Sequence, residues 1–418
     1  MSKSPMPLSI KENVSWGIIG NVLYSLTQSG ILIVLARLDS PDSVGTFTLA
    51  LAIVAPIYMF ARMQLNLVYA SDLKNDYIFN DYIAVRIVSS VLMLIILLSV
   101  LTFLDLNNRV LIVVIVIACS KFVEGLSDIC YGVMQKNERI DKVGISKTLR
   151  GILTISFFSF LLYLFKSLEI ATLGLVISGI LTLLLYDFRN TIVYQSIRPR
   201  FIWKNIYKII IIAIPLAFFQ MLLSLNTNMP RYFIEYYYGG TILGYFGAIS
   251  YIVIACVNPL SNAINQSTIS RMSEYYRDHE FEKFKKVLKN ILLVAFFIGV
   301  TGFVGSFFFG KIILSILFGN DYAEHVDVLL VMIVSVAFLI VNSTLGSTLT
   351  SMRFLKVQPF LGIIWLFKTI IFCYFLAPVY GMMGAAFSIL ISSFIQAILR
   401  IAIIKIIIKK SIISDQNL

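Results

Sequence analysis

About twelve long apolar runs, separated by short polar segments, dominate this sequence of 418 residues. A helix needs about 20 apolar residues to cross the hydrocarbon core of a bilayer, and each run has roughly that length. The runs lack the alternation of apolar and polar residues that a membrane β-barrel requires. Only 13% of the residues are charged. The sequence therefore predicts an all-α integral membrane protein with about twelve transmembrane helices.

The predicted spans cover residues 14–36, 45–66, 82–104, 110–134, 144–165, 169–187, 209–237, 242–265, 290–310, 327–349, 358–378 and 382–408. With the N-terminus in the cytoplasm, the cytoplasmic side carries 24 Lys and Arg residues and the outer side carries five. Because cytoplasmic loops are enriched in Lys and Arg, we expect both termini to be cytoplasmic in a bacterial plasma (inner) membrane. The net charge of +12 then reflects topology and anionic lipid rather than nucleic-acid binding.

Two pairs of segments indicate an internal duplication. Residues 36–47 and 235–246 each join two apolar runs by a short turn, and residues 171–178 resemble 382–388. Both pairs connect spans of the same direction, which predicts two six-helix lobes related by a pseudo-twofold axis along the membrane normal. We place the lobes at 1–190 and 209–410, with a cytoplasmic linker at 191–208 and a cytoplasmic tail at 411–418. The polar segment 267–289 is predicted to form an amphipathic helix on the membrane surface.

Several motifs of enzymes and cofactor-binding proteins are incomplete. Residues 305–311 fit only the first part of a phosphate-binding loop, because Ile312 stands where Ser or Thr is needed. The two histidines, His279 and His325, fall in loops on opposite sides of the membrane and cannot form one metal site. The four cysteines lie inside apolar runs and do not suggest a disulfide framework. The sequence therefore favours a transporter, not an enzyme, with no cofactor and with coupling to H⁺ or Na⁺.

Ionisable residues inside a span cost at least ~2.5–3.5 kcal/mol each, so they require an explanation. Lys121, Glu124 and Asp128 fall at i, i+3 and i+7 on one face of the span at 110–134. They form either a neutralised network that fixes helix packing or a polar wall of a central cavity. Because the acids outnumber the local base, we expect one carboxylate to remain for protonation or cation binding. Glu124 and Asp128 are thus the candidates for ion coupling.

Two further cations are candidates for contact with an anionic substrate. Arg231 follows Pro230 in the span at 209–237, where it can snorkel outward, pair with Glu235 or face the cavity. We favour the cavity because a guanidinium matches phosphate geometry. Lys368 lies near the middle of its span with no acidic neighbour in the same helix, so we expect it to face the cavity as well.

Three arginines lie within a turn or two of predicted cytoplasmic helix ends: Arg62, Arg86 and Arg150. For these we expect snorkelling towards lipid phosphates. Arg62 and Arg150 are retained as additional candidates for substrate contact.

Residues 16–24, together with 44–47, resemble the start of Wzx-type polysaccharide-biosynthesis flippases. These flippases belong to the multidrug/oligosaccharidyl-lipid/polysaccharide exporter superfamily. Residues 124–135 and 226–235 are similar to one branch of the family, and the resemblance runs over essentially the whole chain. Pro230 departs from the broader family, in which an acidic residue often precedes the arginine.

The resemblance implies a MATE-like fold and flipping of an undecaprenyl-diphosphate-linked oligosaccharide from the cytoplasmic to the outer leaflet, for O-antigen or capsule assembly. It implies alternating access driven by an ion gradient, with Arg231, Lys368 and Lys121 facing the diphosphate and Glu124 or Asp128 as the coupling carboxylate. The implied partners are membrane lipids and the polymerase and glycosyltransferases of the same pathway. We expect a monomer.

Other functions remain open at this point. A drug/cation antiporter of the same superfamily shares the twelve-span architecture and would be favoured by an acidic cavity. A lipid II flippase usually carries two further spans. A membrane polysaccharide polymerase would need a long, charged outer loop, and an O-acyltransferase would need an intramembrane histidine. A scaffold without transport activity leaves the buried charges unexplained.

Overall fold

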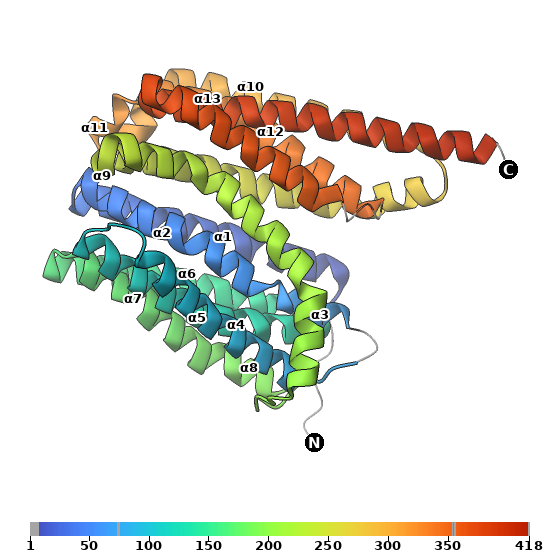
Figure 1. The fold of residues 1–418 in the computed structure, drawn as a ribbon, viewed down its shortest axis with the longest axis horizontal. Coiled ribbons are helices and arrows are strands. Elements are labelled where there is room, and N and C mark those ends of the chain that lie inside the picture. The colour runs from blue at the N-terminus through green and yellow to red at the C-terminus, as the bar shows by residue number, and fades with distance from the viewer. Residues whose placement is uncertain (1–7, 73–75, 353, 355–356, 417–418) are drawn as a thin grey trace. The chain divides into compact units, whose positions relative to one another are not determined.

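The computed structural model describes residues 8–72, 76–352, 354 and 357–416, and within these ranges it contains helices and no β-strand. Of the predicted cytoplasmic basic residues, Lys3, Lys74, Arg353 and Lys356 lie outside the described residues. Figure 1 shows the helices in chain order. They are α1 (Ile10–Leu38), α2 (Pro41–Arg62), α3 (Leu65–Ser71), α4 (Phe79–Leu101), α5 (Asn108–Lys136), α6 (Ile140–Phe165), α7 (Leu168–Thr182), the π-helical turn η1 (Leu183–Asp187), α8 (Phe188–Ile192), α9 (Trp203–Arg277), α10 (Phe281–Leu317), α11 (Asn320–Ala323), α12 (Val326–Ser351) and α13 (Val357–Gln416).

Within the described ranges, ten helical segments are long and apolar enough to cross a membrane. Two of them, in α9 and α13, extend over 60 and 53 residues, which is enough for two spans each. The ten segments therefore account for the twelve predicted spans, and the prediction of an all-α, multi-pass membrane protein is confirmed.

Both long helices fold back on themselves at a glycine. Gly239 in α9 has φ of 76° and Gly381 in α13 has φ of 57°, a region that side-chain-bearing residues rarely adopt. The Cζ atom of Arg231 lies 5.1 Å from the ring centre of Tyr251, although 20 residues of straight helix would separate them by about 30 Å. Across the second break, Lys368 reaches Gln396 at 2.8 Å. The predicted span boundaries at 237–242 and 378–382 thus coincide with two helical hairpins.

The contacts divide the chain into two compact units, residues 1–225 and 226–418. The division falls inside α9, whereas we predicted a linker at 191–208. Its cause is the first part of α9, whose Ile206, Ile209, Ala213 and Ala217 pack in one apolar cluster with Tyr82 of α4. The assignment of functional lobes to these segments stays a prediction.

Glycines permit the close helix pairs within each unit. A Cβ atom on Gly20 of α1 would lie 2.4 Å from the Cα atom of Gly144, which explains the tight packing of α1 on α6. A Cβ atom on Gly174 would lie 2.7 Å from the backbone nitrogen of Phe158, and one on Gly384 would lie 2.0 Å from the carbonyl oxygen of Leu376. Gly174 and Gly384 occupy equivalent positions in the second repeated segment. Gly174 lets α7 approach the backbone of α6, and Gly384 lets the part of α13 after Gly381 approach the part before it. The two repeated segments therefore share a glycine for the same reason, close packing against a backbone.

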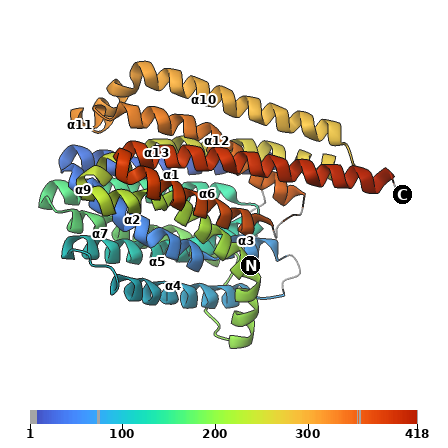
Figure 2. The ribbon, with the colours of Figure 1, turned by 45° about the horizontal axis from the view of Figure 1, so that its top comes forward.

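The segment at 267–289 is not the separate surface helix that we predicted. Residues up to Arg277 complete α9, and α10 begins at Phe281 and continues through the membrane-spanning part. Phe281 and Phe284 are buried against their own unit. Residues 281–298 contain no Gly or Pro that would break the helix, so α10 continues through the predicted start of the span at residue 290. Figure 2 shows α10 as one long helix that follows the end of α9.

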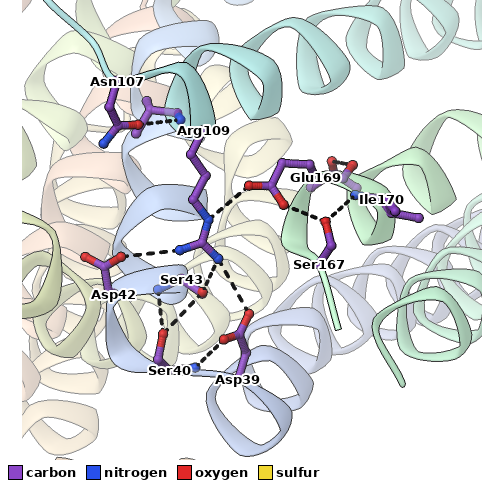
Figure 3. A network of polar contacts seen from close by, with 11 residues as sticks. Asp39, Ser40, Asp42, Ser43, Asn107, Arg109, Ser167, Glu169 and Ile170 are labelled. Atoms are coloured by element: carbon purple, nitrogen blue, oxygen red, sulfur yellow. Dashed lines mark hydrogen bonds and ion pairs between the residues drawn. The ribbon is translucent and has the colours of Figure 1, made fainter. Parts of the chain in front are cut away.

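One polar network joins three connections in unit 1 at a single end of the helices (Figure 3). The guanidinium of Arg109, at the start of α5, is 3.0 Å from Glu169, 3.5 Å from Asp42 and 3.8 Å from Asp39. Its Nη2 also donates to the Oγ atom of Ser43 at 2.7 Å. The carboxylates belong to the α1–α2 connection and to the first turns of α2 and α7. Arg109 therefore ties these helix ends together.

Candidate functional site

A buried ion-pair cluster in unit 1 centres on Asp128 of α5. Its Oδ1 atom accepts from Nη2 of Arg62 at 2.7 Å, and its Oδ2 atom accepts from Nη2 of Arg86 at 3.0 Å. The side chains of Asp128 and Arg86 are 5% and 1% exposed, whereas that of Arg62 is 32% exposed. Arg86 also donates to the carbonyl oxygen of Ala61 at 3.4 Å. Helices α2, α4 and α5 thus bring two cations to one carboxylate.

A second ion pair lies on the same face of α5. Nζ of Lys121 donates to Oε2 of Glu124 at 2.7 Å, and the two side chains are 22% and 25% exposed. The ammonium of Lys121 also lies 5.4 Å from the ring centre of Tyr58. Our expectation that one carboxylate would lack a basic partner was wrong, since the bases that pair with Asp128 come from other helices. The cluster has three cations and two carboxylates.

Arg86 and Arg150 do not snorkel towards lipid, contrary to our prediction. Both are buried within unit 1, at 1% and 5% exposure, because α4 and α6 turn these faces inward. Gly179 of α7 makes room for Arg150, since a Cβ atom there would lie 2.8 Å from Nη2 of the arginine. Among the described residues, this Nη2 has no hydrogen-bond partner. Arg150 is therefore a buried cation with an unused donor.

Unit 1 holds a further buried carboxylate, Asp187, which the sequence analysis did not single out. Asp187 is fully buried at the end of η1, where it accepts a 2.5 Å hydrogen bond from Ser146, whose hydroxyl also contacts that of Tyr131 at 2.9 Å. Single-turn π-helical segments are frequent at functional sites. We had treated Asp187 as the cytoplasmic end of its span. A polar residue that directly follows an apolar run gave no signal that it points inward.

In unit 2, Arg231 is buried at 4% exposure in α9. Its Nη1 donates to Oδ1 of Asn228 at 2.9 Å, and the guanidinium lies over the ring of Tyr251 at 5.1 Å. Nη2 has no hydrogen-bond partner among the described residues. This burial excludes the outward-snorkelling interpretation, and the observed polar contact is to a neutral amide.

Lys368 of α13 is half-buried, and its Nζ atom donates to Oε1 of Gln396 at 2.8 Å. Arg400, one helical turn after Gln396, is 3% exposed. It donates to the carbonyl oxygen of Asn342, and its guanidinium lies 5.6 Å from the ring centre of Trp365. Arg400 falls inside the predicted span at 382–408, and its side chain packs between α13 and α12. A position near the end of an apolar run does not reveal which way a side chain points.

The structure therefore gathers the predicted residues into two sets. Arg62, Lys121, Glu124 and Asp128 form the cluster around α5, with Arg150 nearby on α6 of the same unit. Arg231 and Lys368 lie in unit 2, where α9 and α13 are joined by a 2.7 Å hydrogen bond from Thr369 to Asn226. Arg86, for which we had predicted snorkelling, joins the cluster around α5. Asp187 and Arg400 are buried charges that the sequence analysis did not single out.

Comparison with known proteins gives a consistent picture. The sequence model of the family described as "Polysaccharide biosynthesis protein" matches residues 34–327. The chain is 32% identical to the capsular polysaccharide biosynthesis protein CapF of Staphylococcus aureus, over 93% of this chain and 97% of that protein.

Two solved structures share the fold. An inward-facing MATE-family multidrug resistance transporter matches with a TM-score of 0.73 and 13% identity, over 93% of this chain and 95% of that one. The lipid II flippase MurJ in an inward closed conformation also matches with a TM-score of 0.73, at 15% identity, over 93% of this chain and 87% of that one. At these identities the likeness shows the fold alone, and it confirms the predicted MATE-like architecture.

Proposed function

Because the chain belongs to the polysaccharide biosynthesis protein family, we propose that it is a flippase for undecaprenyl-diphosphate-linked oligosaccharide repeat units. It moves them from the cytoplasmic to the outer leaflet of a bacterial plasma membrane, for assembly of capsule or O-antigen. It acts as a monomer with both termini in the cytoplasm, beside the polymerase and glycosyltransferases of its pathway. No bond of the substrate is made or broken, so the protein is a transporter and not an enzyme.

The observation that carries this proposal is the set of cations in unit 2 with neutral partners. Arg231, Lys368 and Arg400 form no ion pair among the described residues, and their polar contacts are to amide or carbonyl oxygens. A buried charge without a counter-charge is costly, so such cations favour a site that receives an anion. A diphosphate supplies that anion, and a guanidinium can bind it through two parallel hydrogen bonds. A site for a cationic drug would instead require free carboxylates.

In unit 1, Arg62 is the cation that can move to the substrate. It is 32% exposed, whereas Arg86 is 1% exposed, and both pair with Asp128. If Arg62 leaves Asp128 for a phosphate oxygen, Arg86 still neutralises the carboxylate. We therefore assign Arg62 to substrate contact and Arg86 to a fixed position beside Asp128, with Arg150 as a further substrate cation.

The pair Lys121–Glu124 supplies a way to couple substrate binding to an ion gradient. When Glu124 is neutralised by H⁺ or by bound Na⁺, Lys121 loses its 2.7 Å partner and becomes available to the diphosphate. Release of the ion restores the pair and expels the anion. Asp128 is the second coupling carboxylate of the same cluster. Alternating access of two six-helix lobes would expose the cations first to one leaflet and then to the other.

A deletion strain tests the function. We expect loss of surface polysaccharide and accumulation of the lipid-linked repeat unit in the cytoplasmic leaflet. Accumulation of single repeat units in the outer leaflet would instead indicate a polymerase, and normal export would refute both functions. Normal export with altered resistance to cationic drugs would indicate the antiporter.

Complementation tests the residues. Arg231→Ala, Lys368→Ala and Glu124→Gln should each reduce export at equal protein level, whereas Lys311→Gln, an exposed lysine of α10, should not. A buried or half-buried residue whose replacement leaves export unchanged has no essential role in the cycle.

A further inference from the structure

A groove of about 320 Å³ lies in unit 2 between the last part of α9 and the first part of α10. From α10 it is lined by Val287, Asn290, Ile291 and Val294, which share one helical face at i, i+3, i+4 and i+7. This apolar face is partly open, since Val294 is 48% exposed.

Among the described side chains, the wall from α9 is formed by Ile264, Thr268 and Arg271, at i, i+4 and i+7 on one face. The hydroxyl of Thr268 donates to the carbonyl oxygen of Ile264 at 2.7 Å, so that hydrogen-bonding group is satisfied within α9. Arg271 is thus the charged member of the groove.

The groove has a polar end and an apolar end. Arg271 and Val287 lie nearest the turn at 278–280 that joins the two helices, whereas Ile264 and Val294 lie furthest from it along their helices. The charge distribution predicts that this turn is cytoplasmic. A molecule in the groove therefore meets a cation near the turn and an apolar wall towards the membrane interior.

Three exposed cations near the turn already have an acidic partner, but Arg271 has none within the described ranges. Arg277 pairs with Asp278 at 2.8 Å, Lys283 with Glu280 at 2.6 Å and Lys285 with Glu282 at 2.8 Å. Among the described residues, Arg271 forms no ion pair, although Glu274 follows one turn later. Lys286 and Lys289 on α10 likewise have no ion pair within the described chain. Of these three unpaired cations, Arg271 is the one that lines the groove itself.

We propose that this groove binds an anionic phospholipid of the leaflet that faces the basic turn. The phosphate contacts Arg271 at the polar end, with Lys286 close by, and one acyl chain lies along Val287, Ile291 and Val294. Charge complementarity selects an anionic over a zwitterionic lipid, because each basic residue near the surface attracts anionic headgroups. The site is separate from the buried cations assigned to the transported substrate and does not depend on the proposed function.

The purified full-length chain in nanodiscs of phosphatidylcholine, with phosphatidylglycerol titrated in, tests the site. Retention of phosphatidylglycerol by native mass spectrometry gives an apparent affinity. We expect Arg271→Gln to weaken it by about tenfold or more, since a charge-assisted hydrogen bond is lost. Val294→Trp, which fills the apolar end, should weaken it as well. The matched control Lys285→Gln removes an equal charge from α10 outside the groove and should leave the affinity within about twofold of wild type.

Equal weakening by Arg271→Gln and Lys285→Gln would mean that the lipid responds only to the overall charge of the turn, which overturns the site. So would equal retention of phosphatidylcholine and phosphatidylglycerol by the wild-type protein. Since Arg271 and Val294 are both exposed, the variants should keep the elution volume and unfolding midpoint of wild type in lipid-free detergent. If Arg271→Gln changes the elution volume or the unfolding midpoint, the test rests on Val294→Trp. Unchanged affinity of that variant for phosphatidylglycerol would refute lipid binding in the groove.

Discussion

Replacing Asp128 by Asn tests whether the central ion-pair cluster of unit 1 depends on charge. The substitution keeps the shape of the side chain but removes the negative charge that Arg62 and Arg86 share. Arg86 is then a cation at 1% exposure whose remaining hydrogen bond, to the carbonyl oxygen of Ala61, is long at 3.4 Å. Breaking a buried pair and leaving one charge uncompensated costs about 3–5 kcal/mol. We expect Asp128→Asn to lower the free energy of unfolding by that amount.

Unfolding of the purified protein in mixed micelles, followed by tryptophan fluorescence as SDS is added, measures the change. Glu282→Gln is the matched control, because it also replaces a carboxylate of an ion pair by an amide, in this case the pair with Lys285. That pair is at the surface, with side-chain exposures of 51% for Lys285 and 88% for Glu282. Surface pairs contribute little, so the control should match wild type within experimental error.

A double variant separates charge from packing. Asp128→Asn combined with Arg86→Met removes both the carboxylate and the fully buried cation, and replacing a buried pair by apolar atoms is often nearly neutral. It should therefore be more stable than Asp128→Asn alone. The reasoning is refuted if the single variant is no less stable than Glu282→Gln, or if the double variant recovers nothing.

Three further predictions concern separate parts of the chain. Arg62→Gln should reduce export about tenfold but lower the free energy of unfolding by only about 1 kcal/mol, because Asp128 keeps its ion pair with Arg86. If the variant loses stability in proportion to its loss of export, Arg62 does not exchange between Asp128 and the substrate. Arg109→Ala should lower the unfolding free energy by about 1 kcal/mol, and high salt should shrink that difference, whereas a salt-independent loss would indicate packing instead. Gly384→Ala should cost about 1–3 kcal/mol because its Cβ atom meets a backbone carbonyl at 2.0 Å, whereas Gly305→Ala, with no neighbour within 4 Å, should be tolerated. Equal stability of the two glycine variants would show that the helices separate without cost.

The fold followed from the sequence because its main determinant is local. A run of about 20 apolar residues must be helical in lipid, since every backbone group has to be satisfied within the segment. Even the two hairpin turns at Gly239 and Gly381 fell where the apolar runs were divided. The sequence could not show that 281–289 continues into α10, because an amphipathic first turn looks the same on a surface helix and on a spanning one.

The charged cluster was predictable only in part, because its partners are distant in sequence. The i, i+3, i+7 spacing correctly put Lys121, Glu124 and Asp128 on α5, and the i, i+3 pair formed as helix geometry requires. The partners of Asp128 lie 66 and 42 residues away, on α2 and α4. A carboxylate count restricted to one helix therefore misjudged the charge balance. Whether an arginine near a span end snorkels or turns inward depends on its rotation about the helix axis, which the apolar pattern leaves undetermined.

The two units differ in how they treat their buried cations, although their sequences share repeated segments. In unit 1, Asp128 and Glu124 form ion pairs with three basic side chains. In unit 2, Arg231 and Lys368 instead donate hydrogen bonds to neutral amide oxygens. At the repeat offset, the counterpart of Arg231 is Leu32, a fully buried apolar residue of α1. Since a coupling ion needs carboxylates and a diphosphate needs cations without them, this asymmetry supports a division of tasks. We propose that ion coupling belongs to unit 1 and that the stronger anion contact belongs to unit 2.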